Sequence, residues 1–336
     1  MTASSLGMTE LSDYPLSFSP LGRVNGVEVD LLRLDQIDPV ISGNKWFKLK
    51  FNLQCAFREG FTGVMSFGGP HSNHLHALAS AGDRFGFPTL GWVRGWDDSM
   101  VATPTLSDCY NWGMRLQGLS YGDYRKRYDR AFCDQLQSRY PEYRIIPEGG
   151  SNGLGVWGMA ELMRRVFQYT QTGDSSYQGV VCPVGSGGTL AGILLALATW
   201  QFPHVPFVLG VSALKGLTGR LERSVEALVH QGREAGRGLG GPHDGFAMTL
   251  DELPSWSIAH GFHQGGFGLS SAALKKELAF WQAEGVAFDP VYTGKMMMAI
   301  REITAVGEII PSGRLLAIHT GGLQGVRAGS AASHPE

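Results

Sequence analysis

The sequence predicts an α/β protein with open, mostly parallel sheets, helices on both faces of the sheets, and two domains. Short apolar segments typical of buried strands alternate with amphipathic segments typical of helices. The length of 336 residues suits two domains or one large α/β unit. A glycine-rich turn follows several of the apolar segments. Because open sheets bind ligands at the carboxyl ends of their strands, these turns are the expected ligand-binding loops.

The elements are expected in a regular order after an extended arm at residues 1–20. Apolar runs and alternation predict strands at residues 27–31, 64–67, 89–93, 115–119, 143–146, 179–184, 207–211 and 315–318. Apolar periodicity and caps predict helices that begin at Lys45 and Pro104, that run through Leu75–Ala79, Leu162–Val166, Leu190–Leu194 and Leu221–Val225, and that span residues 121–140, 271–284 and 296–306. Residues 232–245 contain six glycines and few apolar residues, which predicts a mobile loop.

The composition is that of an ordinary soluble globular protein, with 43% hydrophobic and 17% charged residues. A net charge of −2 gives no support for nucleic acid or a membrane surface as a partner. The four cysteines have no metal-binding spacing and are expected to be reduced. The first residues lack the features of a signal peptide, and no apolar run reaches membrane-spanning length, so the expected location is the cytoplasm.

Lys45 lies in the stretch Ser42–Lys48, between a glycine that permits a tight turn and two aromatic residues, Trp46 and Phe47. Burial disfavours the charged form of an amine, so a lysine shielded from water is more often the free base that attacks a carbonyl group to form a Schiff base. The alternative is an ordinary surface lysine at the start of a helix.

A predicted strand leads into the turn Gly185, Ser186, Gly187, Gly188 and Thr189, and a predicted helix follows it. Free backbone amides and the positive end of the helix suit a phosphate group, to which the two hydroxyls can donate hydrogen bonds. The turn lacks the Lys-Ser/Thr ending of a nucleotide P-loop and the strict GxGxxG pattern of a dinucleotide site. A tight turn without a ligand is the alternative.

A second strand-to-helix turn spans Gly68–His74. Its amides suit a carboxylate, Ser72 offers a hydroxyl, and Asn73 can reach a phenolic oxygen. The spacing of His71, His74 and His76 matches no zinc signature, so no metal is expected. A role for Ser72 as a helix cap is the alternative.

A Schiff-base lysine, a monophosphate site and a carboxylate site together indicate pyridoxal phosphate with an amino acid. At this point the sequence resembles the 1-aminocyclopropane-1-carboxylate deaminase and D-cysteine desulfhydrase family. The motifs occur in the family's order, over roughly residues 20–325. They are Gly43–Lys45 with Lys48, Gly68–His74, Glu148–Ser151, Gly185–Thr189, Asp289–Lys295 and His319–Gly322.

The resemblance implies the tryptophan synthase β-like fold, which is fold type II of the pyridoxal phosphate enzymes. A large domain of residues 1–47 and 148–336 would hold the cofactor. A smaller inserted domain of residues 48–147 would close over a small amino-acid substrate. The resemblance also implies a homodimer.

The resemblance further implies roles for individual residues. Lys45, Ser72 and Tyr292 would be catalytic, with Lys45 bound to the cofactor. Asn73 would bond the ring oxygen of the cofactor, Gly185–Thr189 would hold its phosphate, and Thr293 and Thr320 would lie near its pyridine nitrogen. The substrate would contact Ser72, Asn73, His74 and Tyr292.

Two departures from the family bear on the substrate. Deaminases that open the cyclopropane ring resemble one another in having Glu and Leu where this chain has Thr293 and Thr320, so the two threonines resemble the desulfhydrases. A neutral hydroxyl leaves the pyridine nitrogen unprotonated and a weaker electron sink, which suffices for loss of a thiolate. Phe267 replaces the usual tyrosine and removes one candidate acid or base.

We therefore expect α,β-elimination of a small amino acid, with D-cysteine converted to pyruvate, ammonia and hydrogen sulfide. Ring-opening deamination to α-ketobutyrate and ammonia, a non-catalytic pyridoxal phosphate carrier or sensor, and a dinucleotide-dependent oxidoreductase are the alternatives. The sequence leaves open the true substrate and its chirality, the rate, the effect of Phe267 and the oligomeric state.

Overall fold

The computed structural model describes residues 14–41, 43–97, 99–170, 176–200, 202–204, 206–241, 253–307 and 313–328. Most of the predicted N-terminal arm, Ser42 and the last part of the predicted loop at 232–245 lie outside these ranges.

Strands and helices alternate along the chain. The strands are β1 (Phe18–Val24), β2 (Val27–Arg33), β3 (Gly63–Gly68), β4 (Thr89–Arg94), β5 (Arg115–Leu119), β6 (Tyr143–Ile145), β7 (Gly179–Val184), β8 (Phe207–Ser212), β9 (Trp256–Ala259) and β10 (Arg314–His319). The helices are α1 (Lys45–Arg58), α2 (Asn73–Phe85), α3 (Pro104–Asn111), α4 (Tyr121–Arg125), α5 (Arg130–Arg139), α6 (Gly153–Thr170), α7 (Gly188–Thr199), α8 (Arg220–Gly238), α9 (Ala272–Ala283) and α10 (Thr293–Val306). Short 3₁₀ helices are η3 (Leu34–Gln36), η4 (Glu148–Gly150) and η6 (Leu323–Ala328).

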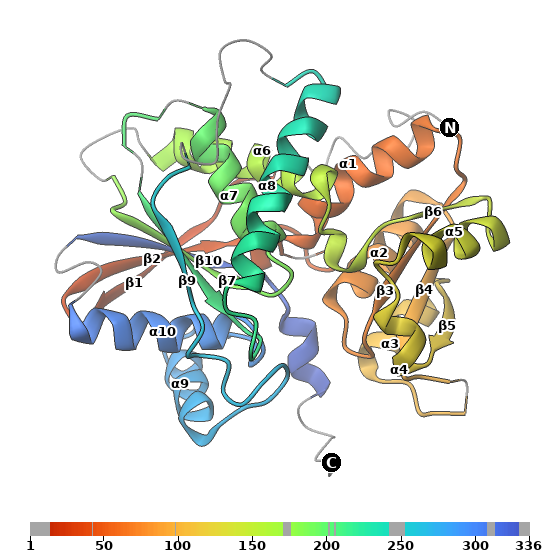
Figure 1. The fold of residues 1–336 in the computed structure, drawn as a ribbon. Helices are drawn as coiled ribbons and strands as arrows, with labels where there is room; N and C mark the ends of the chain where they lie inside the picture. The colour runs from red at the N-terminus through yellow and green to blue at the C-terminus, as the bar shows by residue number, and fades with distance from the viewer. Residues whose placement is uncertain are drawn as a thin grey trace.

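The strands form two open sheets, which lie beside each other with α1 at their junction (Figure 1). The larger sheet has the order β1-β2-β10-β7-β8-β9, and only the β1–β2 pair is antiparallel. The smaller sheet has the order β5-β4-β3-β6 and is entirely parallel. The predicted α/β class with mostly parallel sheets is confirmed.

Helices cover both faces of each sheet because the central strands are apolar on both faces. Alternate residues of β7 point to opposite sides. Val180 and Cys182 pack in the same core cluster as α6, α7 and α8, whereas Val181 packs in the cluster of α9 and α10. In the smaller sheet, Met65 and Phe67 of β3 pack with residues of α4 and α5, while α2 and α3 belong to the other core cluster.

The predicted loop at residues 232–245 is wrong up to Gly238, because α8 continues to that residue. A Cβ atom at Gly232 would lie 2.5 Å from Val156 Cγ1, and one at Gly236 would lie 2.4 Å from Trp157 Cε3. These glycines permit close packing of α8 on α6. They belong to a tightly packed helix, although their frequency in the sequence suggested an irregular loop.

Other predictions differ from the structure in detail. The expected helix at 121–140 is two helices, α4 and α5, and the Asp129 side chain caps the second by accepting hydrogen bonds from the amides of Ala131 and Phe132. The edge strands β1 and β9 were not predicted. The division into two domains and the homodimer stay predictions. Among the described residues, every helix is too short or too polar to span a bilayer.

Candidate active site

Lys45 is the first residue of α1, and the chain before it is fixed on two sides. The Gly43 amide donates to the Leu34 carbonyl at 2.8 Å, and the Asn44 amide donates to the Thr320 carbonyl at 3.1 Å. Gly43 has a φ of +79°, and a Cβ atom there would overlap the Thr320 carbonyl oxygen. Only glycine allows the turn to lie this close to the end of β10.

The amine of Lys45 is half-buried, and its Nζ donates to Asn44 Oδ1 at 2.7 Å. Desolvation lowers the pKa of Lys45 to about 8, although the negative charge of Asp289 opposes the shift. A pKa in this range makes a substantial fraction of the amine a free base near neutral pH, as a nucleophile requires.

The turn Gly185–Thr189 connects β7 to α7, as the sequence predicts. Asn44 Nδ2 donates to Thr189 Oγ1 at 2.7 Å, and both side chains are buried. The same asparagine therefore contacts the Lys45 amine through one side-chain atom and the Gly-rich turn through another. The structure brings the predicted nucleophile and the predicted phosphate turn together.

Lys48 also faces this turn, and sequence reasoning gave it no role beyond membership of a motif. Its side chain is 3% exposed, and its Nζ donates to Ser151 Oγ at 3.4 Å. Ser151 Oγ lies 2.6 Å from Ser186 Oγ. A Cβ atom at Gly188 would lie 3.0 Å from Lys48 Nζ, so the glycine keeps open the space between the turn and the amine. The spacing of three residues from Lys45 was the available signal, since it places both lysines on one side of a helix.

Burial and the charge of Lys45 hold the pKa of Lys48 well below its ordinary value. An anion bound in the turn would offset both effects. A phosphate group therefore fits this site, because the turn supplies amides and hydroxyls and Lys48 supplies the cation.

The second turn, Gly68–Asn73, connects β3 to α2. Ser72 is the N-cap of α2 and its Oγ accepts a hydrogen bond from the Leu75 amide at 3.2 Å, so the helix-cap interpretation describes its contact in this structure. Asn73 Oδ1 accepts a hydrogen bond from Gln324 Nε2 at 3.0 Å. A Cβ atom at Gly322 would lie 2.9 Å from Asn73 Nδ2, so this turn faces the segment after β10.

His74 is buried, and its Nε2 lies 2.8 Å from Ser66 Oγ. Burial and the charges of Lys45 and Lys48 lower the pKa of His74 to about 3, so the ring is neutral. The predicted contact of His74 with substrate stays a prediction. His76 points elsewhere, with its Nε2 3.2 Å from Asp108 Oδ2. In the ranges that the structure describes, no group of three or more His, Cys, Asp or Glu residues is arranged to hold a metal ion.

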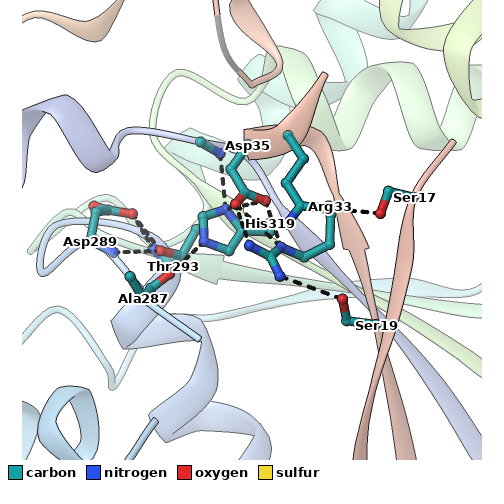
Figure 2. Close-up of polar contacts among 10 residues, drawn as sticks. Ser17, Ser19, Arg33, Asp35, Ala287, Asp289, Thr293 and His319 are labelled. Atoms are coloured by element: carbon teal, nitrogen blue, oxygen red, sulfur yellow. Dashed lines mark hydrogen bonds and ion pairs between the residues drawn. The ribbon is translucent and has the colours of Figure 1, made fainter. Parts of the chain in front are cut away.

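Asp289, to which the sequence assigned no role, organises the start of α10. Its carboxylate accepts hydrogen bonds from the amides of Val291, Tyr292 and Thr293 and, at 2.5 Å, from the Thr293 hydroxyl. Figure 2 shows the Asp289–Thr293 pair beside His319. A carboxylate is stabilised at a helix N-terminus. The predicted helix at 296–306 begins three residues after the observed start of α10 at Thr293, so no sequence pattern indicated that Asp289 lies four residues before the helix.

Tyr292 lies against the first turn of the site. A Cβ atom at Gly185 would lie 2.9 Å from Tyr292 Cε1, and the Phe267 ring packs edge-on against the Tyr292 ring with centroids 6.0 Å apart. Burial, with the charge of Asp289, raises the pKa of Tyr292. The phenol is therefore protonated at neutral pH. Phe267 itself is 51% exposed.

A buried polar cluster surrounds His319 at the end of β10, directly before Thr320 (Figure 2). His319 lies 2.9 Å from the Ala287 carbonyl through Nε2, and its Nδ1 accepts from the Gly321 amide at 3.2 Å. The Asp35 carboxylate lies 3.4 Å from His319 Nδ1 and is paired with Arg33. This cluster fixes the carbonyl of Thr320 that holds Asn44.

A lysine with a lowered pKa and a phosphate turn with a second, buried lysine lie together at the carboxyl ends of parallel strands, and this arrangement defines an enzyme site that fits pyridoxal phosphate. The chain belongs to the family described as "Pyridoxal-phosphate dependent enzyme", whose model matches residues 11–321. The predicted cofactor, the enzyme class and the family resemblance are confirmed.

Known relatives are similar over nearly the whole chain. A candidate 1-aminocyclopropane-1-carboxylate deaminase of Thermotoga maritima is 28% identical over 327 residues, which cover 95% of this chain and 97% of the relative. A D-cysteine desulfhydrase of Serratia proteamaculans is 25% identical, with 94% and 89% covered. A bifunctional D-cysteine desulfhydrase/1-aminocyclopropane-1-carboxylate deaminase of Arabidopsis thaliana is 27% identical, with 91% and 75% covered.

A solved structure of an ACC deaminase homologue superposes with a TM-score of 0.73 at 24% identity and covers 97% of each chain. At this identity the likeness shows the fold alone. It agrees with the fold type II architecture that the sequence predicted.

Proposed function

We propose that this enzyme catalyses α,β-elimination of a small amino acid, with D-cysteine as the leading substrate. The observation that carries the proposal is the amine of Lys45, whose pKa is lowered to about 8 and whose partner Asn44 also bonds Thr189 in the phosphate turn. This chain of contacts fixes the distance between the nucleophile and the phosphate turn, as a cofactor that is held at both ends requires.

Several residues would hold the cofactor. Lys45 would bind it covalently, the turn Gly185–Thr189 with Lys48 would bind its phosphate, and Asn73 would donate to its ring oxygen. When bound, pyridoxal phosphate withdraws electrons from the substrate Cα, so that a proton and then a β-substituent can leave.

The protein would supply the proton transfer and the orientation. Lys45 Nζ would act as the base that takes the α-proton of the substrate. The free amides and Ser72 hydroxyl of the turn Gly68–Asn73 would bind the substrate carboxylate. Tyr292, with its protonated phenol, would lie beside the substrate and donate a hydrogen bond to the departing group.

The preference for elimination over ring opening rests on Thr293 and Thr320. The Thr293 hydroxyl donates to Asp289 and stays neutral, so it provides no acid for the pyridine nitrogen. The names of the relatives include both activities, so ring-opening deamination is the second candidate. We also propose that residues 48–147 close over the bound substrate and that the enzyme is a homodimer.

The test is product analysis with the purified enzyme and pyridoxal phosphate. D-Cysteine is expected to give pyruvate and hydrogen sulfide, and L-cysteine and 1-aminocyclopropane-1-carboxylate serve as comparisons. Formation of α-ketobutyrate from the cyclopropane substrate without pyruvate from D-cysteine would favour the second candidate. No product from any of the three would contradict the D-cysteine proposal and direct the search to other β-substituted amino acids.

A further inference from the structure

We propose that the Arg94 guanidinium binds a negatively charged substituent on the substrate β-carbon, and that the enzyme therefore accepts amino acids with such a substituent. The inference rests on the proposed α,β-elimination and names a substrate class beside D-cysteine, whose thiol is mainly neutral at pH 7. It is carried by the position of Arg94, by its lack of a carboxylate partner, and by its neighbours.

Arg94 is the last residue of β4 and so lies at the carboxyl edge of the smaller sheet. The neighbouring strand β3 ends at Gly68, directly before the turn proposed to bind the substrate carboxylate. A Cβ atom at Gly69 would lie 3.3 Å from Arg94 Nη2. The guanidinium therefore lies against this turn, on the side that glycine leaves open.

Arg94 is one of two arginines around Tyr124, and only one of the two is neutralised. Arg127 Nε donates to Glu148 Oε2 at 2.6 Å, and the Tyr124 hydroxyl donates to the other oxygen of the same carboxylate. The guanidinium carbons of Arg94 and Arg127 lie 5.6 and 4.5 Å from the Tyr124 ring centroid. Within the described ranges, no carboxylate forms an ion pair with Arg94. One positive charge therefore remains in this cluster, where a bound anion would pair with it.

Glu148 begins η4, and a Cβ atom on the next residue, Gly149, would lie 3.2 Å from Ser186 Oγ in the turn against which Tyr292 packs. The charge of Glu148 raises the pKa of the Tyr292 phenol and the charge of Arg94 lowers it, so both groups lie near enough to act on this hydroxyl. The substrate would lie between Tyr292 and the turn Gly68–Asn73. Arg94 would then meet the substituent on the substrate β-carbon.

The chemistry suits an anionic leaving group such as a sulfate ester. The α-proton moves to Lys45 Nζ, and the electrons of the Cβ–O bond leave with sulfate. Overall, O-sulfoserine and water give pyruvate, ammonium, sulfate and a proton, with no oxidant or reductant. β-Chloroalanine, which has a neutral substituent, gives pyruvate by the same elimination and serves as the matched comparison.

The test compares kcat/KM for O-sulfo-D-serine and β-chloro-D-alanine in four proteins: the wild type, Arg94→Gln, Arg94→Lys and Arg115→Gln. Arg115 is the matched control because its guanidinium also lies over a tyrosine ring, 5.7 Å from the centroid of Tyr140, but at the opposite edge of the same sheet. We expect Arg94→Gln to lower the ratio of kcat/KM for the sulfate ester to that for the chloride at least tenfold. Arg94→Lys should restore part of the ratio, and Arg115→Gln should leave it unchanged.

An equal loss of both activities in Arg94→Gln would assign Arg94 to the α-carboxylate and overturn the proposal. An unchanged ratio would overturn it as well.

A binding experiment distinguishes failure of the proposed anion site from failure of the proposed reaction. The cofactor-loaded wild type and variants are titrated calorimetrically with succinate and with butyrate. We expect succinate to bind more tightly than butyrate, and this difference to disappear in Arg94→Gln. If the wild type forms no pyruvate but succinate keeps its Arg94-dependent advantage, the reaction is wrong and the anion site stands. If succinate has no such advantage, the anion site is wrong whether or not pyruvate forms.

Discussion

The two glycine-containing turns of the site, Gly185–Thr189 and Gly68–Asn73, have the same position between a strand and a helix but different surroundings. Both follow a fully buried strand and lead into a helix. Behind the first turn lie the amines of Lys45 and Lys48, which are linked to it through Asn44 and Ser151. In the second turn the hydroxyl residue Ser72 is engaged as a helix cap, and the cation beside the turn is the Arg94 guanidinium near Gly69.

This difference indicates what each turn contributes. A turn backed by a buried ammonium is suited to a doubly charged phosphate and would provide affinity for the cofactor. The second turn, with the Arg94 guanidinium beside Gly69, is suited to a smaller anion such as a carboxylate and would provide orientation of the substrate. Substitutions of Lys45 and Lys48 therefore test the role of the first turn, and substitution of Ser72 tests the role of the second.

The largest effect is expected for Lys45→Ala. Loss of the amine proposed to bind the cofactor and take the α-proton should reduce turnover by roughly 10²–10⁴-fold or more, and the visible absorption of the bound cofactor should disappear. Lys275→Ala, an exposed lysine of α9, is the control and should behave as the wild type. Turnover retained by Lys45→Ala would contradict the assignment of Lys45 as the cofactor-binding lysine and base.

The next effect is expected for Lys48→Met, which removes the buried cation of the first turn. A hydrogen bond to a charged group contributes about 1.5–3 kcal/mol, so cofactor affinity should fall by roughly 10- to 100-fold. Equilibrium dialysis measures this affinity of the protein for the cofactor. Because burial already disfavours the charged form of Lys48, an apolar side chain of similar length should be tolerated in the cofactor-free protein. Unchanged cofactor affinity would mean that the first turn binds phosphate without this amine.

A pH effect of about tenfold is expected for attachment of the cofactor to the cofactor-free protein. Burial lowers the pKa of Lys45 to about 8, so the free amine rises from about a tenth at pH 7 to about nine-tenths at pH 9. The rate should rise with pH through about 8 and then level off, as stopped-flow absorbance can measure. A rate that still rises tenfold per pH unit above pH 9 would indicate an unperturbed lysine.

The smallest effect is expected for Ser72→Ala, which removes the cap of α2. Loss of an N-cap costs about 1 kcal/mol of folding free energy, as denaturant unfolding can measure. Ser72→Asn keeps a capping oxygen and should restore stability. If Ser72→Asn also restores KM for the substrate, then Ser72 acts through the helix start alone. If stability returns but KM does not, the hydroxyl itself contacts the substrate.

Much of this site followed from the sequence because its parts are local. The glycine turns follow apolar strands directly, and Lys45 is the first residue of a helix, so both features are visible as local patterns in the sequence. The strand at Arg115–Leu119 and the buried strand at Gly179–Val184 have the predicted bounds.

The missed features depend on contacts between distant segments. Asn44 meets Thr189, and Lys48 meets Ser151, only after α1 has packed beside α6 and α7. Gly232 and Gly236 indicated a loop by composition, but they serve to pack α8 against Val156 and Trp157. The four-residue edge strand β9 carries too few residues to give a period.

The most direct test of the central claim is to find which lysine holds the cofactor. The cofactor-loaded protein is reduced with borohydride, which makes the covalent link permanent, and the modified residue is located by tandem mass spectrometry of its peptides. We predict modification at Lys45, with Lys48 unmodified three residues later. Modification at Lys48, or at neither lysine, would contradict the assignment of Lys45 as the nucleophile and Lys48 as the phosphate partner.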